Sequence, residues 1–166
     1  VLFYLFVYMK LYNEKFMQRA FELAYNGLKE GVGGPFGAVV VKAGKIIGEG
    51  NNCVTSTNDP SAHAEMVAIR NACKYLNDFQ LKDCEIYSSC EPCPMCLGAI
   101  YWARPRRLYF ALTREDAAKI GFEDEFIYEE MKKNYNQRKI PTFKVELKNG
   151  IKVFEAWENL ESKIKY

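Results

Sequence analysis

The chain has 166 residues, of which 49% are hydrophobic and 27% are charged, which is ordinary for one globular domain. Its 23 basic and 21 acidic residues leave a formal net charge of +2. This balance argues against a broad nucleic-acid-binding surface and suits a small neutral substrate, although it leaves a local basic patch open.

The first eight residues differ from the rest of the chain. Residues 1–8 are continuously apolar and aromatic, but they are too short to span a bilayer and lack the basic region and cleavage site of a signal peptide. We expect a non-native extension, with natural translation starting at Met9. The alternative is an N-terminal interaction segment. Residues 9–166 are then expected to form a single domain.

The chain contains six cysteines without a convincing secretion signal. In that context they are interpreted as reduced thiols rather than as a disulfide framework. We therefore expect a cytoplasmic protein that does not associate with membranes.

The first half of the chain predicts a helix, a hairpin and a second helix. Asn13 precedes apolar residues at helical spacing, which continue as far as Gly31. Two apolar runs, 36–42 and 45–50, are joined by a turn dipeptide and predict a β-hairpin. Asp59-Pro60 then predicts a helix cap with proline at the first helical position, opening a helix that ends before Asp78.

Strands and helices continue to alternate in the second half. The predicted strands are residues 84–89, 106–112 and 142–147, the predicted helices are 93–102, 122–133 and the final segment from Val153 to Ile164, and 113–121 connects them with partial helical character. This alternation predicts an α/β fold, a three-layer α/β/α sandwich with a mixed sheet of about five strands.

Two short motifs carry residue types that suit a zinc site. His63, the one histidine of the chain, lies two positions before Glu65, and Pro92 precedes the pair Cys93 and Cys96. Imidazole and thiolate bind zinc well, and three protein ligands leave a fourth position for a water whose pKa the metal lowers. A carboxylate beside the metal can then carry protons, a role that suits Glu65.

The spacing constrains where this site can lie. On a helix, residues two positions apart are separated by about 200°, so His63 and Glu65 reach one site only near the first turn. Cys93 and Cys96, three positions apart at a helix start, lie on one face, and the positive end of the helix dipole favours their thiolates. We therefore expect two helix N-termini to meet at one metal.

These motifs resemble the zinc-dependent cytidine deaminase superfamily, and more closely the bacterial guanine deaminases within it. The resemblance runs from about Asn13 to Tyr166 and rests on GGPFGAVVVK, NDPSAHAEMVAIR, SCEPCPMCLGAIYWARP and GFEDEFIYEE. It implies a cytidine-deaminase-like fold and one Zn²⁺ per chain, held by His63, Cys93 and Cys96. It also implies hydrolysis of guanine to xanthine and ammonia by a zinc-bound hydroxide, with Glu65 as proton shuttle, in purine catabolism or salvage.

The same resemblance adds weaker positions. It implies that Asp124 assists proton transfer and that Asn52 binds the purine, and it aligns Phe36 and Trp102 with aromatic residues near the base. It also implies a homodimer whose C-terminal segments are swapped, with Tyr166 helping to close the partner's site. Taken without the resemblance, these residues suit a turn, a solvated helix start, core packing and a frayed terminus. Cys90 and Glu91 are candidates only for the surroundings of the metal ligands.

Other functions remain as alternatives. A tRNA adenosine deaminase uses the same metal residues and requires a basic groove, for which Arg104, Arg106 and Arg107 are candidates. The balanced charge and the acidic segment GFEDEFIYEE disfavour this nucleic-acid partner. A cytosine or pterin deaminase is a further alternative. A non-catalytic zinc scaffold would need a fourth ligand and would have no use for Glu65.

Overall fold

The computed structural model describes residues 12–165, so the expectations for residues 1–8 and for Tyr166 lie outside the described residues. The chain divides into two compact units, Val1–Asp124 and Glu125–Tyr166. The single domain expected over residues 9–166 stays a prediction.

The first unit is built around a mixed sheet with the strand order β2-β1-β3-β4. β1 pairs antiparallel with both β2 and β3, while β3 and β4 are parallel. The strands are β1 (Gly37–Lys42), β2 (Lys45–Asn51), β3 (Cys84–Cys90) and β4 (Arg107–Leu112). The predicted hairpin is confirmed, and its turn residues Ala43 and Gly44 both have positive φ, as a tight two-residue hairpin turn requires.

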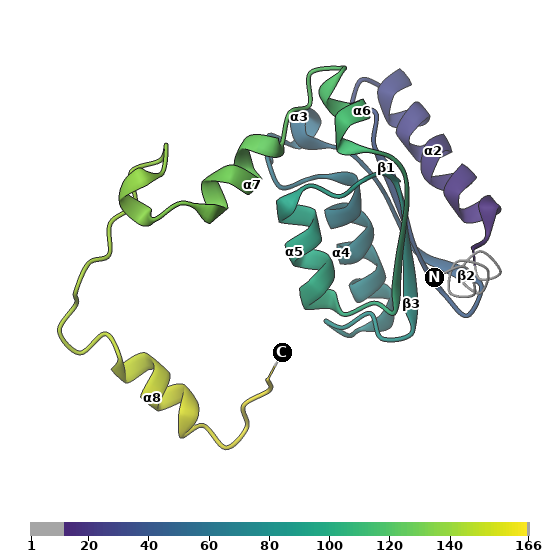
Figure 1. Cartoon of the computed structure of the whole chain (residues 1–166). Helices are drawn as coiled ribbons and strands as arrows, with labels where there is room; N and C mark the ends of the chain where they lie inside the picture. The colour runs from purple at the N-terminus through teal and green to yellow at the C-terminus, as the bar shows by residue number, and fades with distance from the viewer. Residues whose placement is uncertain (1–11, 166) are drawn as a thin grey trace, which may run out of the picture. The chain divides into compact units, whose positions relative to one another are not determined.

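Helices cover both faces of this sheet (Figure 1). They are α2 (Glu14–Lys29) on one face, α4 (Ala64–Leu76) and α5 (Pro94–Ala103) on the other, and the short helices α3 (Val54–Thr57) and α6 (Arg114–Ala118) in the connections. Successive residues of β1 pack against opposite helix layers. Val39 packs with Met17 of α2, whereas Val40 packs with Ala68 of α4. The three-layer α/β/α prediction is confirmed, with four strands rather than five among the described residues.

The missing strand is the one predicted at residues 142–147. This segment has no ladder partner among the described residues, and Phe143, Val145 and Leu147 are 82%, 83% and 79% exposed. Sequence alternation specifies which side chains share a face, but a strand also needs a neighbour that satisfies its backbone hydrogen bonds. Residues 142–147 are therefore not part of a ladder among the described residues.

The helix predicted to open at Asp59-Pro60 begins later. Asp59 Oδ1 accepts a hydrogen bond from the backbone N–H of Ser61 (2.8 Å), which closes a local turn rather than capping a helix. α4 begins at Ala64, with His63 as its N-cap in an extended conformation (φ −68°, ψ 156°). His63 consequently lies just before the helix, and Glu65 lies in its first turn.

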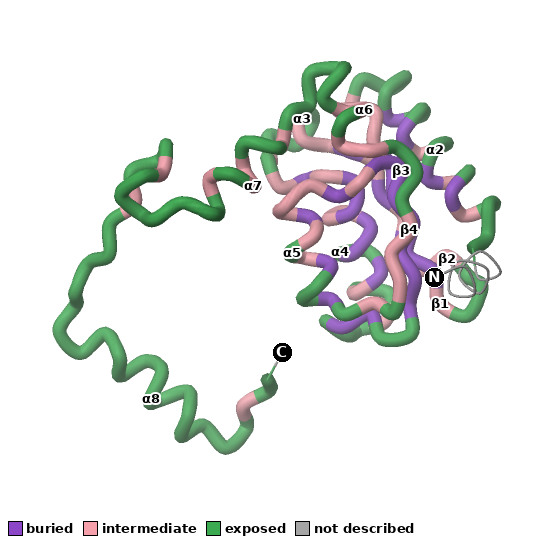
Figure 2. The backbone as a smooth tube through the Cα atoms, viewed as in Figure 1, coloured by how far each residue is buried: buried purple, intermediate pink, exposed green. Residues whose placement is uncertain are grey.

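The second unit contains α7 (Glu125–Lys132), the 3₁₀ helix η1 (Tyr135–Gln137) and α8 (Lys152–Glu158). α7 begins three residues later than predicted from residues 122–133, and α8 is shorter than the predicted final helix. Figure 2 shows that most of this unit is exposed. Within residues 12–165, no helix is both long and apolar enough to cross a membrane.

A glycine of β2 allows α4 to approach the sheet closely. A Cβ atom placed on Gly50 would lie 2.3 Å from the carbonyl oxygen of Ala64 and 2.6 Å from the backbone nitrogen of Ala68. Both atoms belong to the first two turns of α4, so they cannot move without displacing the helix. Only glycine fits this approach, which sets the position of the helix start beside His63.

We predict that Gly50→Ala lowers the free energy of unfolding by about 1–3 kcal/mol, because the new methyl group pushes α4 away from β2. Urea denaturation followed by circular dichroism measures this change. Gly98→Ala in α5 is the control, since a Cβ there meets nothing within 4 Å. The control is expected to raise stability by up to about 1 kcal/mol. Equal stabilities for the two variants would contradict the steric argument.

Candidate metal and catalytic site

Three side chains with metal-binding atoms converge at the starts of α4 and α5. The ligand atoms of His63, Cys93 and Cys96 all lie within 4.8 Å of one another, and among residues 12–165 they form the one such group of three or more. His63 Nδ1 lies 3.5 Å from Cys93 Sγ. Cys93 is the N-cap of α5, as His63 is of α4, and Cys96 is buried in the first turn of α5. Two helix N-termini thus bring the three side chains together.

The electrostatics of this group suit a cation. The pKa of Cys93 lies below that of an ordinary thiol because Cys93 accepts a hydrogen bond from Cys96 and also interacts with His63. The same bond, together with burial, raises the pKa of Cys96. The pKa of His63 is raised mainly by Cys93. One imidazole and two sulfurs within this span fit a tetrahedral zinc ion with its fourth position open.

Glu65 lies beside this group, inside the protein. Its side chain belongs to the first turn of α4, the residue is 6% exposed, and burial raises the pKa of its carboxyl group. Ser88 of β3 donates a hydrogen bond from Oγ to Glu65 Oε1 at 3.0 Å. Ser88 was not among the site residues predicted from the sequence. The signal that could have indicated it is a hydroxyl residue within the predicted strand 84–89, whose other residues suit the core.

Cys90 and Glu91 fasten the loop that leads to Cys93. Cys90 Sγ donates to the carbonyl oxygen of Thr113 (3.4 Å), and burial raises the pKa of this thiol to about 11. The backbone N–H of Glu91 donates to the Leu112 carbonyl (2.8 Å), while Glu91 Oε2 accepts from the backbone N–H of Arg114 (3.2 Å). These contacts tie the Cys93 loop to the end of β4.

Asp124 and Asn52 have different surroundings. The pKa of Asp124 is raised by partial burial and then by the negative charge of Cys93, so this carboxyl group interacts electrostatically with a member of the candidate metal group. Asn52 is buried, and its Oδ1 accepts hydrogen bonds from the backbone N–H groups of Gly34 and Val54, both at 3.2 Å. The oxygen of Asn52 is thus engaged within the protein, and its purine-binding role stays a prediction.

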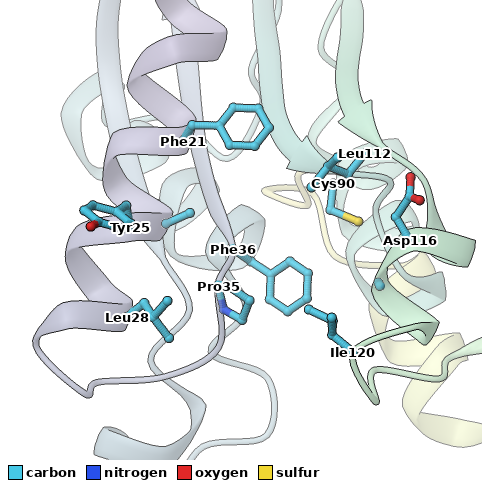
Figure 3. A pocket seen from close by; sticks show the side chains of 11 residues that line it. Phe21, Tyr25, Leu28, Pro35, Phe36, Cys90, Leu112, Asp116 and Ile120 are labelled. Carbon is cyan, nitrogen blue, oxygen red and sulfur yellow. The ribbon is translucent and has the colours of Figure 1, made fainter.

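The predicted aromatic residues are less closely connected to the metal group. The Phe36 ring packs edge-on against Phe122 with centroids 4.9 Å apart, and it lines an apolar cavity of about 250 Å³ together with Phe21 and Ile120 (Figure 3). Trp102 is 64% exposed near the end of α5, whereas the cysteines are at its start. Their substrate-binding roles stay predictions, as does that of Tyr166.

Comparison with known proteins agrees with this geometry. Residues 11–112 match the cytidine and deoxycytidylate deaminase zinc-binding region, and the chain belongs to this family of zinc-binding deaminases. Guanine deaminase of Bacillus subtilis is 54% identical over 154 residues, which are 93% of this chain and 99% of that protein. Its X-ray structure matches this one with a TM-score of 0.91 over the same shares. The resemblance inferred from the motifs is confirmed.

Two further relatives are less similar. The structure of guanine deaminase from Nitrosomonas europaea matches with a TM-score of 0.65 at 34% identity, covering 68% of this chain and 65% of that one. The tRNA-specific adenosine deaminase of Haemophilus influenzae is 40% identical over 126 residues, 75% of this chain and 71% of that protein. Similarity to the Bacillus subtilis enzyme covers more of both chains than either of these.

We predict that Cys96→Ser abolishes stable zinc binding, because a serine hydroxyl at this position does not replace a thiolate ligand. Zinc per chain, measured by inductively coupled plasma mass spectrometry after dialysis, is expected to be near zero for the variant. Cys73→Ser is the matched control, since burial raises the pKa of Cys73 and it lies outside the metal group. Equal zinc contents in the two variants would exclude Cys96 as a ligand.

Proposed function

We propose that this chain hydrolyses guanine to xanthine and ammonia, with one zinc ion per chain held by His63, Cys93 and Cys96. The observation that carries the proposal is the buried Glu65 beside a three-donor group at two helix starts. Similarity to a guanine deaminase over nearly the whole chain supports the choice of substrate. The product places the reaction in purine catabolism or salvage.

The proposed reaction uses both the metal ion and side chains of the protein. When bound, zinc supplies at its fourth position a water of lowered pKa for hydrolysis. Glu65 would take one proton from the attacking water and deliver it to the ring of the base. It would then carry the second proton, from the hydroxyl group newly bonded to C2, to the departing amino group. Its burial favours this role, because a carboxyl group with a raised pKa holds a proton more readily near neutrality.

Two further residues act on the base in this proposal. Asn52 donates its amide N–H to an acceptor of the purine, since its own oxygen is engaged by the backbone of Gly34 and Val54. Asp124 assists proton transfer to the leaving amino group, and its raised pKa suits a proton carrier. Water adds to C2 of guanine, the bond from C2 to the exocyclic nitrogen breaks, and ammonia leaves.

The rival substrate is an adenosine in tRNA. The relative from Haemophilus influenzae supports this alternative, and it requires basic side chains available for phosphates. Two of the three arginines considered for that purpose are engaged within the protein, because Arg106 and Arg107 both bind Glu85 Oε1, at 2.8 and 3.0 Å. This internal pairing favours the small base over the nucleic acid.

The substrate is tested by ammonia release from a panel of free bases and from a tRNA anticodon stem-loop that carries adenosine at the wobble position. Guanine is expected to be turned over, and the stem-loop is expected to be inert. The phosphate-binding alternative predicts stem-loop deamination that weakens as salt is raised. Inertness toward guanine together with deamination of the stem-loop would replace the proposed substrate.

Swapped C-terminal segments between two copies are the second part of the proposal. β4 lies at one end of the sheet order, so one of its edges has no ladder partner among the described strands. The segment 142–147 carries alternating apolar side chains that its own unit leaves exposed. If segment 142–147 of a second copy pairs with β4, the backbone groups of that segment and those at the edge of β4 form hydrogen bonds with each other. Tyr166 then closes the partner's site.

The cytoplasmic location stays a prediction.

The homodimer is tested by sedimentation equilibrium at micromolar concentration, where the chain is expected to have twice the mass of one copy. Val145→Asp is expected to shift it toward monomer, because a charge on the apolar face opposes burial. Lys144→Ala is the control, since neighbouring residues of an extended segment point to opposite sides. A monomeric wild-type chain would contradict the swap.

A further inference from the structure

Ser88 is a hydroxyl residue at the centre of the most buried strand. All seven residues of β3 are buried, and Ser88 is 2% exposed. By the alternation of a strand, Ser88 shares a face with Cys84 and Ile86, which pack in the apolar cluster that includes Ala64 and Ala68 of α4. An apolar residue suits such a position, so a buried hydroxyl requires a partner.

That partner is the carboxyl group of Glu65. Ser88 Oγ donates to Glu65 Oε1 at 3.0 Å. The serine backbone is held on both sides, because Ser88 is opposite Ala38 of β1 and Phe110 of β4 in the two ladders. The donor therefore belongs to the rigid sheet rather than to a loop, and it fixes one carboxyl oxygen.

We infer that Ser88 is a positioning residue: by holding Oε1, it orients the Glu65 carboxyl group so that Oε2 is the oxygen that exchanges protons with water and base. This inference rests on the proposed proton-carrying role of Glu65. The terminal torsion of a glutamate has a broad energy minimum, so loss of this contact widens the range of orientations that the carboxyl group samples, although it also interacts with its own backbone and with Cys96. A poorly oriented proton carrier slows the chemical step while base binding is unaffected.

The neighbouring Ser89 provides a matched control. It is 1% exposed, and its Oγ accepts a hydrogen bond from the backbone N–H of Gly37 at 3.0 Å. Successive strand residues point to opposite faces, so Ser89 faces away from the α4 side. Removing its hydroxyl deletes a buried hydrogen bond of similar length from the same strand without changing the contact to Glu65.

The test measures kcat, KM and zinc content with guanine for Ser88→Ala, Ser89→Ala and Glu65→Gln. Ser88→Ala is expected to lower kcat by about ten- to a hundredfold, with KM changed by less than about threefold and zinc retained. Ser89→Ala is expected to lower thermal stability and leave kcat near the wild-type value. Glu65→Gln is expected to keep zinc and lose nearly all turnover.

A second pair of variants separates hydrogen bonding from packing. Ser88→Thr and Ser88→Val have side chains of nearly the same shape, and only threonine can donate to Glu65. Threonine is expected to recover most of the kcat lost in Ser88→Ala, and valine is not. Equal kcat for this pair would overturn the inference, and so would a wild-type kcat for Ser88→Ala beside an inactive Glu65→Gln. Full activity in Glu65→Gln would instead overturn the proposed role of Glu65.

Discussion

The close approach of α4 to β2 is the constraint on which the site depends. Added Cβ atoms on Gly48 and Gly50 would lie 2.4 and 2.3 Å from the carbonyl oxygens of Ala68 and Ala64, so helix and strand meet backbone to backbone. The alanines on the facing side of the helix make the same approach possible, since larger side chains would hold the two elements apart. This contact determines how far the start of α4 lies from the sheet, and therefore where His63 and Glu65 lie.

The two helix starts contribute different chemical groups to the site. The start of α5 supplies both sulfur atoms, and its approach loop is tied to the end of β4 through Cys90 and Glu91. The start of α4 supplies the imidazole and the carboxyl group, with Glu65 turned inward to Ser88 on the central strand. The start of α4 therefore directs an imidazole to the candidate metal group and a carboxyl group to the protein interior. Both helices pack on the same sheet, which holds these side chains at constant positions relative to one another.

The second unit has the opposite character. Its apolar side chains are largely exposed, in contrast to the continuous core of the first unit. A large share of exposed apolar side chains is typical of a segment that forms an interface. One edge of β4 has no partner among the described strands and can accept an added strand, so the proposed swap joins this edge to the exposed segment.

The sequence by itself determined the chemistry of the candidate site and the layered α/β fold, because ligand type, helix starts and strand alternation are properties of near neighbours along the chain. One local feature became clear only in the structure: Asp59 closes a turn with Ser61, so α4 begins at Ala64. Two further features depended on contacts between distant segments and were decided by the tertiary structure. The strand predicted at residues 142–147 has no partner in the described chain. Ser88 meets Glu65 across 23 positions of sequence, a pairing that local patterns cannot specify because it depends on how α4 lies on the sheet.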